Sequence, residues 1–367
     1  MKIGKLRIIS TLIILTISTL LFTACSGGGA YPGAIAYQRV VENDSQIYVM
    51  DPAGEVKTRV SEGGGWYFMP SWAQDGEKLA YYFFNPGTQM TSVYAVDVTE
   101  VDFEQTLLTD RATYDINFGA LKWSPDGKTI LYHSVDVLEI ADIYTVDVDT
   151  GVVKDIFEDT IFYDYSPDWS PDGTQFVFAS NRPDRDQPIF DLFIADASGE
   201  NLVNLTDNNN NGWVDTLPAW SSDGEKIAFW RFNYIEGENF EGGPAGIWLY
   251  DLTTQEETLV YEMEDASDET APVWSPNGKY LAFLEGENDQ HTLRVAKIPS
   301  GELLDIALVT GDKRAVSWSP DSRALVFSNY ADSTIGVYIL DVKSGELSEV
   351  IESDPEASIG DPHWGGR

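Results

Sequence analysis

Short runs of β-branched and aromatic residues recur along the chain from residue 34 onward, and polar turn residues separate them. The runs keep a partial alternation of apolar and polar positions, and no convincing stretch has the period of a helix. The pattern therefore predicts β-strands. One unit repeats, in which a tryptophan is followed by a turn, a strand, a loop and a second strand that ends near an aspartate. The repeating tryptophans are Trp72, Trp123, Trp169, Trp220, Trp274, Trp318 and Trp364.

The turn after each tryptophan has the residues that a type I turn requires. Proline presets φ, aspartate or asparagine caps the turn, and glycine closes it. The fullest copies are Ser124-Pro125-Asp126-Gly127 and Ser170-Pro171-Asp172-Gly173, whereas the copy at 73–76 lacks proline and the last one has Ser322 in place of glycine. The strands predicted after the turns are 79–82, 130–133, 176–179, 227–230, 281–284 and 325–328, and the second strands are 93–98, 142–148, 191–197, 246–252, 292–298 and 336–342.

The two ends of the repeat region complete each other. Strand-like segments at 35–37 and 46–50 lack a tryptophan strand, and Pro362-His363-Trp364 is a tryptophan strand that lacks the rest of its unit. We therefore expect an all-β fold, a seven-bladed β-propeller of four-stranded blades over residues 34–367, closed by pairing of the N- and C-terminal strands. Seven blades in this range give about 48 residues each, which is a normal propeller repeat.

These motifs resemble the TolB-type, WD40-like (PD40) propeller repeat family. The best copies are Trp169 to Gly173 with Ser180-Asn181-Arg182, and Trp274-Ser275-Pro276-Asn277-Gly278. The resemblance implies that the tryptophans are structural and pack between neighbouring blades. It also implies a binding module that offers the mouth of its central channel to a protein or glycan partner. We expect a monomer, because a closed ring of blades leaves no free sheet edge.

The first 33 residues have the layout of a bacterial lipoprotein leader. Three cationic residues precede an uncharged apolar run at 8–22, which is too short for a comfortable membrane span and suits a signal peptide. Small residues then lead to Cys25, the only cysteine. The resemblance implies a signal peptide over 1–24, a lipid on Cys25 and a flexible tether over 25–33. The alternative is an ordinary secretory signal with a chance cysteine.

A lipid-anchored protein of this kind would lie outside the cytoplasm, in the cell envelope. We expect the outer membrane and periplasmic side in a Gram-negative organism and the cell surface otherwise. The charge balance fits no nucleic-acid partner, because 60 acidic residues face 23 basic ones and phosphate binding requires Lys and Arg.

One loop has the alternating oxygen ligands of a calcium site. Asp207, Asn209, Asn211 and Asp215 fall at positions 1, 3, 5 and 9, Gly212 allows the sharp bend, and Trp213 offers its carbonyl. Position 12 holds Pro218 in place of the usual glutamate, so an ion would need a further carboxylate, such as Asp184 or Asp186. The alternative is a solvated turn rich in asparagine and glycine.

Candidate ligand-binding residues gather at the channel mouth, where the loops that lead into the tryptophan strands emerge. Acidic residues stand five positions before three tryptophans, and aromatic side chains lie in nearby segments. The candidates are Trp66, Asp164, Asp184, Asp186, Trp230, Tyr234, Glu269 and Asp361. The alternative for the acids is turn capping on a generally acidic surface.

No catalytic residue can be assigned. The chain has no Gly-x-Ser-x-Gly motif, and its three histidines stand far apart in sequence. The second hypothesis is nevertheless an enzyme, a metal-assisted lyase or a hydrolase that acts on glycans with carboxylates of the channel mouth, because an acidic mouth offers carboxylate pairs.

Overall fold

The computed structural model describes most of the chain beyond residue 30. The described ranges are 31–55, 57–99, 103–109, 120–135, 140–158, 161–182, 189–207, 212–233, 245–263, 271–287, 290–306, 310–331, 334–352 and 357–366. Within these ranges every regular element is a β-strand. This agrees with the all-β prediction.

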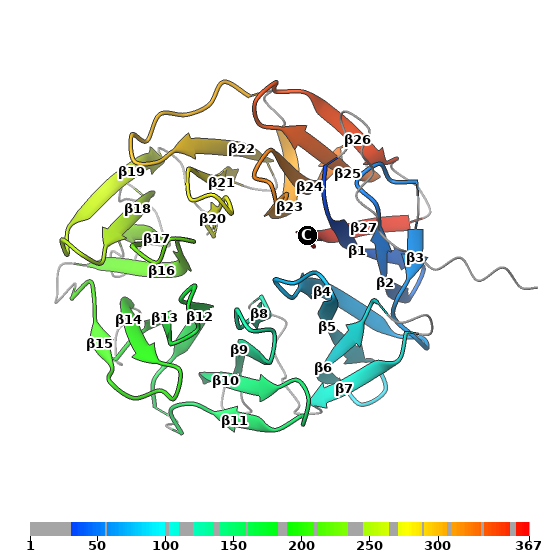
Figure 1. Ribbon diagram of the computed structural model, residues 1–367, viewed down its shortest axis with the longest axis horizontal. Coiled ribbons are helices and arrows are strands. Elements are labelled where there is room, and N and C mark those ends of the chain that lie inside the picture. Colours follow the sequence, from blue (N-terminus) through cyan, green and yellow to red (C-terminus); the bar gives the residue numbers. More distant parts are fainter. Residues whose placement is uncertain are drawn as a thin grey trace, which may run out of the picture.

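The strands form antiparallel sets that stand around a central axis, as in a β-propeller (Figure 1). In each set the strand nearest the axis leads into the repeating tryptophan. The first and last described strands belong to one set, which contains β27 (Ala357–Gly365), β1 (Ala34–Val41), β2 (Asp44–Met50) and β3 (Lys57–Arg59). The next sets are β4 (Trp66–Trp72), β5 (Lys78–Asn85), β6 (Met90–Asp97) and β7 (Gln105–Thr109), then β8 (Lys122–Trp123), β9 (Thr129–Val135), β10 (Ala141–Asp147) and β11 (Val153–Asp155).

The remaining sets follow in chain order. They are β12 (Asp164–Trp169), β13 (Gln175–Ser180), β14 (Asp191–Asp196) and β15 (Val203–Asn204); β16 (Trp213–Trp220), β17 (Lys226–Asn233), β18 (Ala245–Asp251) and β19 (Glu257–Met263); β20 (Val273–Trp274), β21 (Tyr280–Glu287) and β22 (Gln290–Lys297); and β23 (Thr310–Trp318), β24 (Ala324–Ala331), β25 (Thr334–Asp341) and β26 (Leu347–Ile351). Short pairings of β2 with β4 and of β22 with β23 join neighbouring sets.

Strands from the two ends of the chain pair with each other. β27 runs antiparallel to β1, with Ile35 opposite Trp364 and Val41 opposite Ala357. The two incomplete units at the ends of the repeat region predicted this pairing. A strand at the C-terminus therefore fills the innermost place of a set whose other strands come from the N-terminus.

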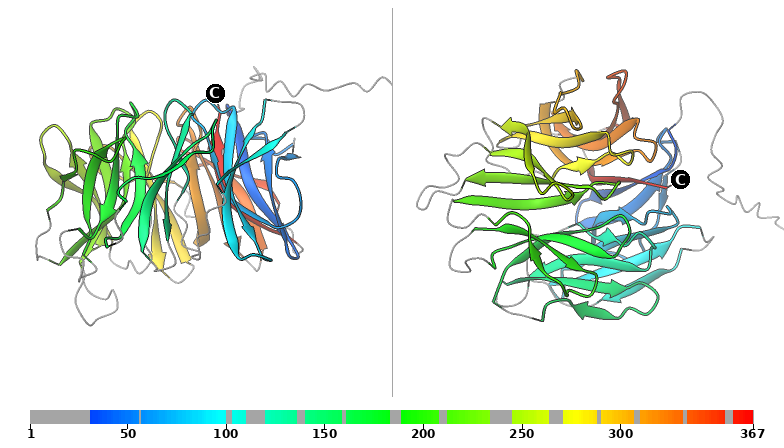
Figure 2. Two further views of the ribbon diagram at one scale, coloured as in Figure 1. Left: turned by 90° about the horizontal axis from the view of Figure 1, so that it is seen from below. Right: turned by 60° about the vertical axis from the view of Figure 1, so that its left-hand side comes forward.

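The strands run between two opposite ends of the ring, which the edge-on view separates (Figure 2). We call one end the turn face; it carries the turns after the tryptophans, such as 170–174, and the turns between third and fourth strands, such as 147–152. We call the other end the mouth face. It carries the hairpins between second and third strands, such as 85–90, and the starts of the inner strands.

The repeating tryptophans join neighbouring sets, as the sequence predicted. Four indole N–H groups donate to a backbone carbonyl on the inner strand of the preceding set, over 2.9 to 3.1 Å. The donors are Trp123, Trp169, Trp274 and Trp318, and the acceptors are Ser71, Lys122, Ala219 and Val273. In each pair the acceptor stands directly before the repeating tryptophan of the preceding set. The repeat spacing therefore determines this contact.

The turns after the tryptophans contact one another around the axis. A Cβ on Gly173 would stand 3.2 Å from the Pro125 ring of the preceding turn, and the φ of Gly173 is +70°. Glycine is therefore favoured both by conformation and by space. Ser322 occupies the same place with a φ of 61°, and its hydroxyl accepts a hydrogen bond from the Asn277 N–H over 3.0 Å.

A feature that the sequence did not predict recurs in the inner strands. Three positions before the tryptophan, five inner strands have a residue with positive φ, and the pairing register shifts beside it. These residues are Met69, Ser166, Leu217, Ala315 and Asp361. Such β-bulges bend a strand and re-aim its side chains.

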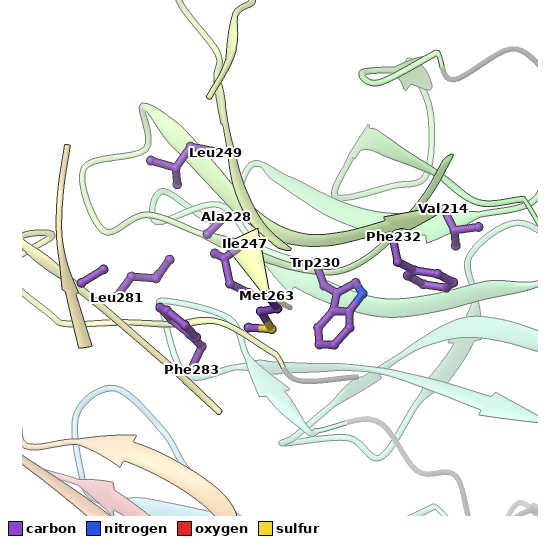
Figure 3. Close-up of a cluster of buried hydrophobic side chains, with 10 residues drawn as sticks. Val214, Ala228, Trp230, Phe232, Ile247, Leu249, Met263, Leu281 and Phe283 are labelled. Atoms are coloured by element: carbon purple, nitrogen blue, oxygen red, sulfur yellow. The ribbon is translucent and has the colours of Figure 1, made fainter. Parts of the chain in front are cut away.

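The hydrophobic core lies between neighbouring sheets. Figure 3 shows one such cluster, in which Met263 lies between Trp230 of β17 and Phe283 of β21. Trp230 is 2% exposed, so it does not offer the surface contact expected from the sequence. The expectation was wrong because neighbouring sheets cover both faces of this sheet. The alternation of side chains along β17 therefore does not distinguish buried from exposed residues.

Candidate functional site

Trp66 is an exposed aromatic side chain of the mouth face. It begins β4 and is 45% exposed, and its indole N–H donates to the Asn43 carbonyl of the β1–β2 hairpin over 3.0 Å. Phe84 contacts the ring edge-on, with centroids 6.5 Å apart. The indole is therefore fixed in place before any ligand arrives, which limits the entropy lost on binding.

The local chain explains the position of Trp66. Three glycines, 63–65, lead into β4, and Gly65 has a φ of 142°. The Gly65 N–H donates to the Asp44 carboxylate over 3.0 Å, and the Ser45 N–H donates to the Gly65 carbonyl over 2.9 Å. These bonds tie the start of β4 to the β1–β2 hairpin.

Asp164, a predicted mouth residue, is buried and paired. It is 0% exposed, and the Arg182 guanidinium donates to it over 2.6 Å. The guanidinium also lies over the rings of Phe157 and Phe162, at 4.5 and 5.0 Å from their centroids. A buried carboxylate with an arginine partner supports the structure between neighbouring sheets and is not a free ligand at the surface.

Asp215, the equivalent residue of the next set, is also 0% exposed. Its two carboxylate oxygens accept hydrogen bonds from Nε and Nη2 of Arg231, over 2.6 and 2.7 Å. Glu257 accepts from the same guanidinium. Burial lowers the pKa of Arg231, but the hydrogen bonds with Asp215 and Glu257 outweigh it and leave the pKa raised. The side chain of Asp215 is thus committed to a buried ion-pair triad.

Asp361 and His363 connect β27 to β4. The Asp361 carboxylate accepts from the Met69 N–H over 3.3 Å, and His363 Nδ1 accepts from the Trp72 N–H over 3.2 Å. Near them, Lys122 pairs with Asp168 over 3.0 Å, and Asp168 also accepts from the Trp220 N–H over 2.8 Å. The polar side chains along the inner strands therefore join one set to the next.

His363 gives a pH-dependent contribution to stability. Protein atoms around the imidazole, and then the Lys122 ammonium, lower its pKa to about 4. Since the unfolded chain protonates near 6.5, the unfolding free energy should fall as the pH drops from about 6.5 through 4. We expect the difference in unfolding free energy between pH 7 and pH 4, measured by urea titration, to shrink in His363→Gln. An equal difference in both proteins would contradict this role.

Several predicted site residues lie outside the described ranges. They are Cys25, Asp184, Asp186, Asn209, Asn211, Tyr234 and Glu269. Of the five proposed calcium ligands, the structure describes Asp207, Trp213 and Asp215. Asp207 has a φ of 37°, and its N–H donates to the Asn204 side chain over 3.1 Å.

The described ranges contain no group of three or more His, Cys, Asp or Glu side chains arranged to hold a metal ion. They also contain no helix long and apolar enough to cross a membrane.

Sequence comparison links the chain to a family of known fold. The family model described as the TolB beta propeller domain (PD40) matches residues 28–233 and 184–354. An uncharacterized protein of Agrobacterium fabrum (strain C58) is 28% identical over 163 residues, which are 44% of this chain and 53% of that protein. The chain therefore matches about half the length of this curated relative.

Two solved structures have a similar fold. TolB from Acinetobacter baumannii has a TM-score of 0.56 at 19% identity, over 92% of this chain and 68% of that chain. Oligogalacturonate lyase from Vibrio parahaemolyticus has a TM-score of 0.60 at 16% identity, over 85% of this chain and 92% of that chain. At these identities the likeness concerns the fold alone.

Proposed function

Because the chain belongs to the TolB β-propeller family, we propose that it is a binding module whose mouth face holds a segment of a protein or glycan partner. The observation that carries this proposal is Trp66, an exposed indole fixed by a hydrogen bond at the mouth face. Large, rigid aromatic side chains are common anchors of binding sites. The net charge of −37 favours a basic partner segment.

The proposal includes a ring of seven blades, closed by β27 and β1. Seven successive sets of strands along the chain support this count. The β20–β22 set has three strands, and an isolated β-bridge joins Ala296 of β22 to Leu303 at the place of a fourth strand. The antiparallel pairing of β1 with β27 supports the closure. A closed ring would present one continuous mouth face to a partner.

We further propose that the protein is held in the cell envelope by lipid on Cys25, after removal of a signal peptide over 1–24. The support is the cationic, apolar and small-residue order of the leader and the single cysteine at its end. Stable anchoring requires more than one acyl chain. A change of Cys25 to serine should release the protein from the membrane fraction of cells.

Trp66→Ala should weaken partner binding at least about tenfold, because it removes an exposed aromatic anchor that a bound partner would cover. The expected change in the unfolding free energy is below about 1 kcal/mol, since nearly half of the side chain is exposed in the free protein. Isothermal titration would follow a screen of basic peptides and of soluble cell-wall and polyuronate fragments. The matched control is Val152→Ala, which changes an exposed apolar residue of the turn face.

The outcomes of this titration separate the candidate functions. Binding that is weakened by Trp66→Ala and not by Val152→Ala supports the mouth face. Equal affinity in all three proteins would contradict it. Cleavage of a glycan fragment by the parent protein would favour the second candidate, a propeller enzyme that acts on glycans.

Calcium binding at residues 207–215 stays a proposal. Since Asp215 is engaged by Arg231, an ion would take its ligands mainly from Asp207, Asn209 and Asn211. We expect calcium to raise the melting temperature, and at a hundredfold excess over Kd to add about 2.7 kcal/mol to the unfolding free energy. Asp207→Ala should abolish the rise, and Asp149→Asn, an exposed change, should keep it. A rise of equal size in both variants would contradict the site.

A further inference from the structure

The first described residues of the chain are fastened to the turn face. The Tyr31 hydroxyl donates to the Asp341 carboxylate over 3.0 Å, and the Tyr31 ring meets the Trp364 ring edge-on at 5.6 Å. The Arg323 guanidinium lies over the Tyr31 ring, 5.4 Å from its centroid. Burial and the bond to Asp341 raise the pKa of Tyr31 to about 12, so the hydroxyl stays a donor at neutral pH.

The next two residues continue this attachment. The Pro32 carbonyl accepts from the Trp364 indole N–H over 2.9 Å. Gly33 has a φ of 89°, and a Cβ there would stand 2.3 Å from the Gly365 carbonyl oxygen and 3.1 Å from Pro320. Pro320, Arg323 and Asp341 belong to turns of one face. We call residues 31–33 the N-terminal strap.

The strap limits how far the chain can reach from an anchor at Cys25. Six residue steps separate Cys25 from Tyr31 and span at most about 20 Å when extended. The mouth face lies at the other end of the strands, and β1 alone, with eight residues, is about 26 Å long. A tether of this length cannot pass along the side of the ring and bring the mouth face to the same surface.

We propose that the turn face is directed toward the lipid surface and that the mouth face, with Trp66, is directed away from it. This orientation rests on the lipid anchor of the proposed function. The surface that the turn face meets is a bilayer, because the tether holds that face within about 20 Å of the acyl chains.

Aspartates in the turns of the turn face disfavour contact with anionic lipid. Aspartates cap its turns, among them Asp126, Asp147, Asp172 and Asp196, whose pKa values are lowered chiefly by hydrogen bonds from neighbouring side chains and backbone N–H groups. These carboxylates stay ionised and are repelled by anionic lipid over a Debye length of about 8 Å. We therefore expect the face to approach a zwitterionic surface more closely than an anionic one.

Energy transfer to labelled lipid tests the orientation. The chain that begins at Cys25 is coupled through its single thiol to maleimide lipid in phosphatidylcholine vesicles that contain an acceptor lipid. A fluorescent amino acid is introduced at Lys343, exposed on the turn face, or at Thr88, exposed on the mouth face. Because about one strand length separates the two faces, transfer should be at least about twofold more efficient from position 343. Equal or reversed efficiencies would overturn the orientation.

A longer tether provides the matched control. Insertion of 15 Gly and Ser residues between Ala30 and Tyr31 should reduce the difference between the two labels, because a flexible linker of that length reaches the mouth face. An unchanged difference would show that the strap and tether do not set the orientation.

Coupling through maleimide lipid separates this inference from the proposed anchor. The mass of the protein made with its own leader reports natural lipidation. An unmodified Cys25 in that sample would overturn the anchor and, with it, the orientation in cells. Equal transfer from both labels in the coupled sample would overturn the geometry even where lipidation occurs.

Discussion

Gly365→Ala is expected to destabilise the protein by about 3 kcal/mol or more, because the added methyl group has no space. A Cβ on Gly365 would stand 2.1 Å from Trp72 Cγ and 2.3 Å from Trp72 Cβ. Gly365 ends β27, and Trp72 ends the neighbouring inner strand β4. The change therefore forces apart the C-terminal strand and the next set. Urea unfolding followed by near-ultraviolet circular dichroism would measure the loss.

Gly64→Ala is the matched control for this prediction. The nearest atom to a Cβ on Gly64 is the Asp44 carboxylate, 3.8 Å away, so the methyl group fits in ordinary contact. We expect a change in unfolding free energy within about 0.5 kcal/mol, as for most surface substitutions. A Gly365→Ala protein as stable as the Gly64→Ala protein would show that β27 is not packed against β4.

Arg231→Ala should cost about 3 to 5 kcal/mol of unfolding free energy, because it leaves the Asp215 carboxylate buried without its partner. Asp215 is fully buried, and both of its oxygens accept from the guanidinium. Glu257 loses the same partner but is partly exposed, with 28% of its side chain accessible. Most of the cost therefore comes from Asp215. Urea unfolding at pH 7 gives the value.

A double variant separates the pair from the packing around it. Arg231→Met with Asp215→Leu removes both charges and keeps side chains of similar bulk, so it should be less destabilised than Arg231→Ala alone. An equal or larger loss in the double variant would contradict the buried-charge explanation. The result also bears on calcium experiments, because an Asp215 variant would alter melting through the ion pair whether or not the loop binds metal.

Much of the fold could be predicted from the sequence, because a repeated unit repeats its contacts. The spacing of the tryptophans placed Trp123, Trp169, Trp274 and Trp318 between neighbouring sets, and their indole hydrogen bonds confirm this structural role. The incomplete units at the two ends predicted the pairing of β1 with β27, which the register confirms. Both features follow from patterns that are local or periodic along the chain.

The partners of the mouth acids could not be predicted in the same way. Asp164 and Asp215 occupy equivalent places before their tryptophans, but their arginine partners do not. Arg231 lies on β17 directly opposite Asp215, whereas Arg182 lies two residues beyond Ser180, the residue of β13 opposite Asp164. Which arginine turns toward which carboxylate depends on side-chain direction across two strands. The sequence alone leaves both a ligand surface and turn capping open for these acids, and the structure places Asp164 and Asp215 inside ion pairs.

The composition of residues 25–33 did not predict the packed N-terminal strap. Glycine and serine residues over 26–29 suggested that the whole of 25–33 is a flexible tether. The structure instead begins its packed part at Tyr31, which is held by Asp341, Arg323 and Trp364. A tyrosine and a proline soon after a glycine-rich stretch were the available signal, because aromatic side chains contribute large apolar areas to packed regions.

The two faces carry different structural features. The turn face receives the N-terminal strap and carries the tightly packed turns, whereas the mouth face carries the fixed and exposed Trp66. Acidic groups along the inner strands, such as Asp168 and Asp361, hold neighbouring sets together. The proposed partner site at Trp66 therefore lies on the face opposite the N-terminal strap.

Hydrogen exchange of the protein with and without its tightest peptide or glycan probe tests the use of the mouth face most directly. Binding there should slow exchange at the hairpins 41–44 and 85–90 and at the start of β4, because these segments surround Trp66. Exchange at the turns 147–152 and 341–346 should stay unchanged. Protection confined to those turns, with none around Trp66, would contradict a binding module that acts through its mouth face.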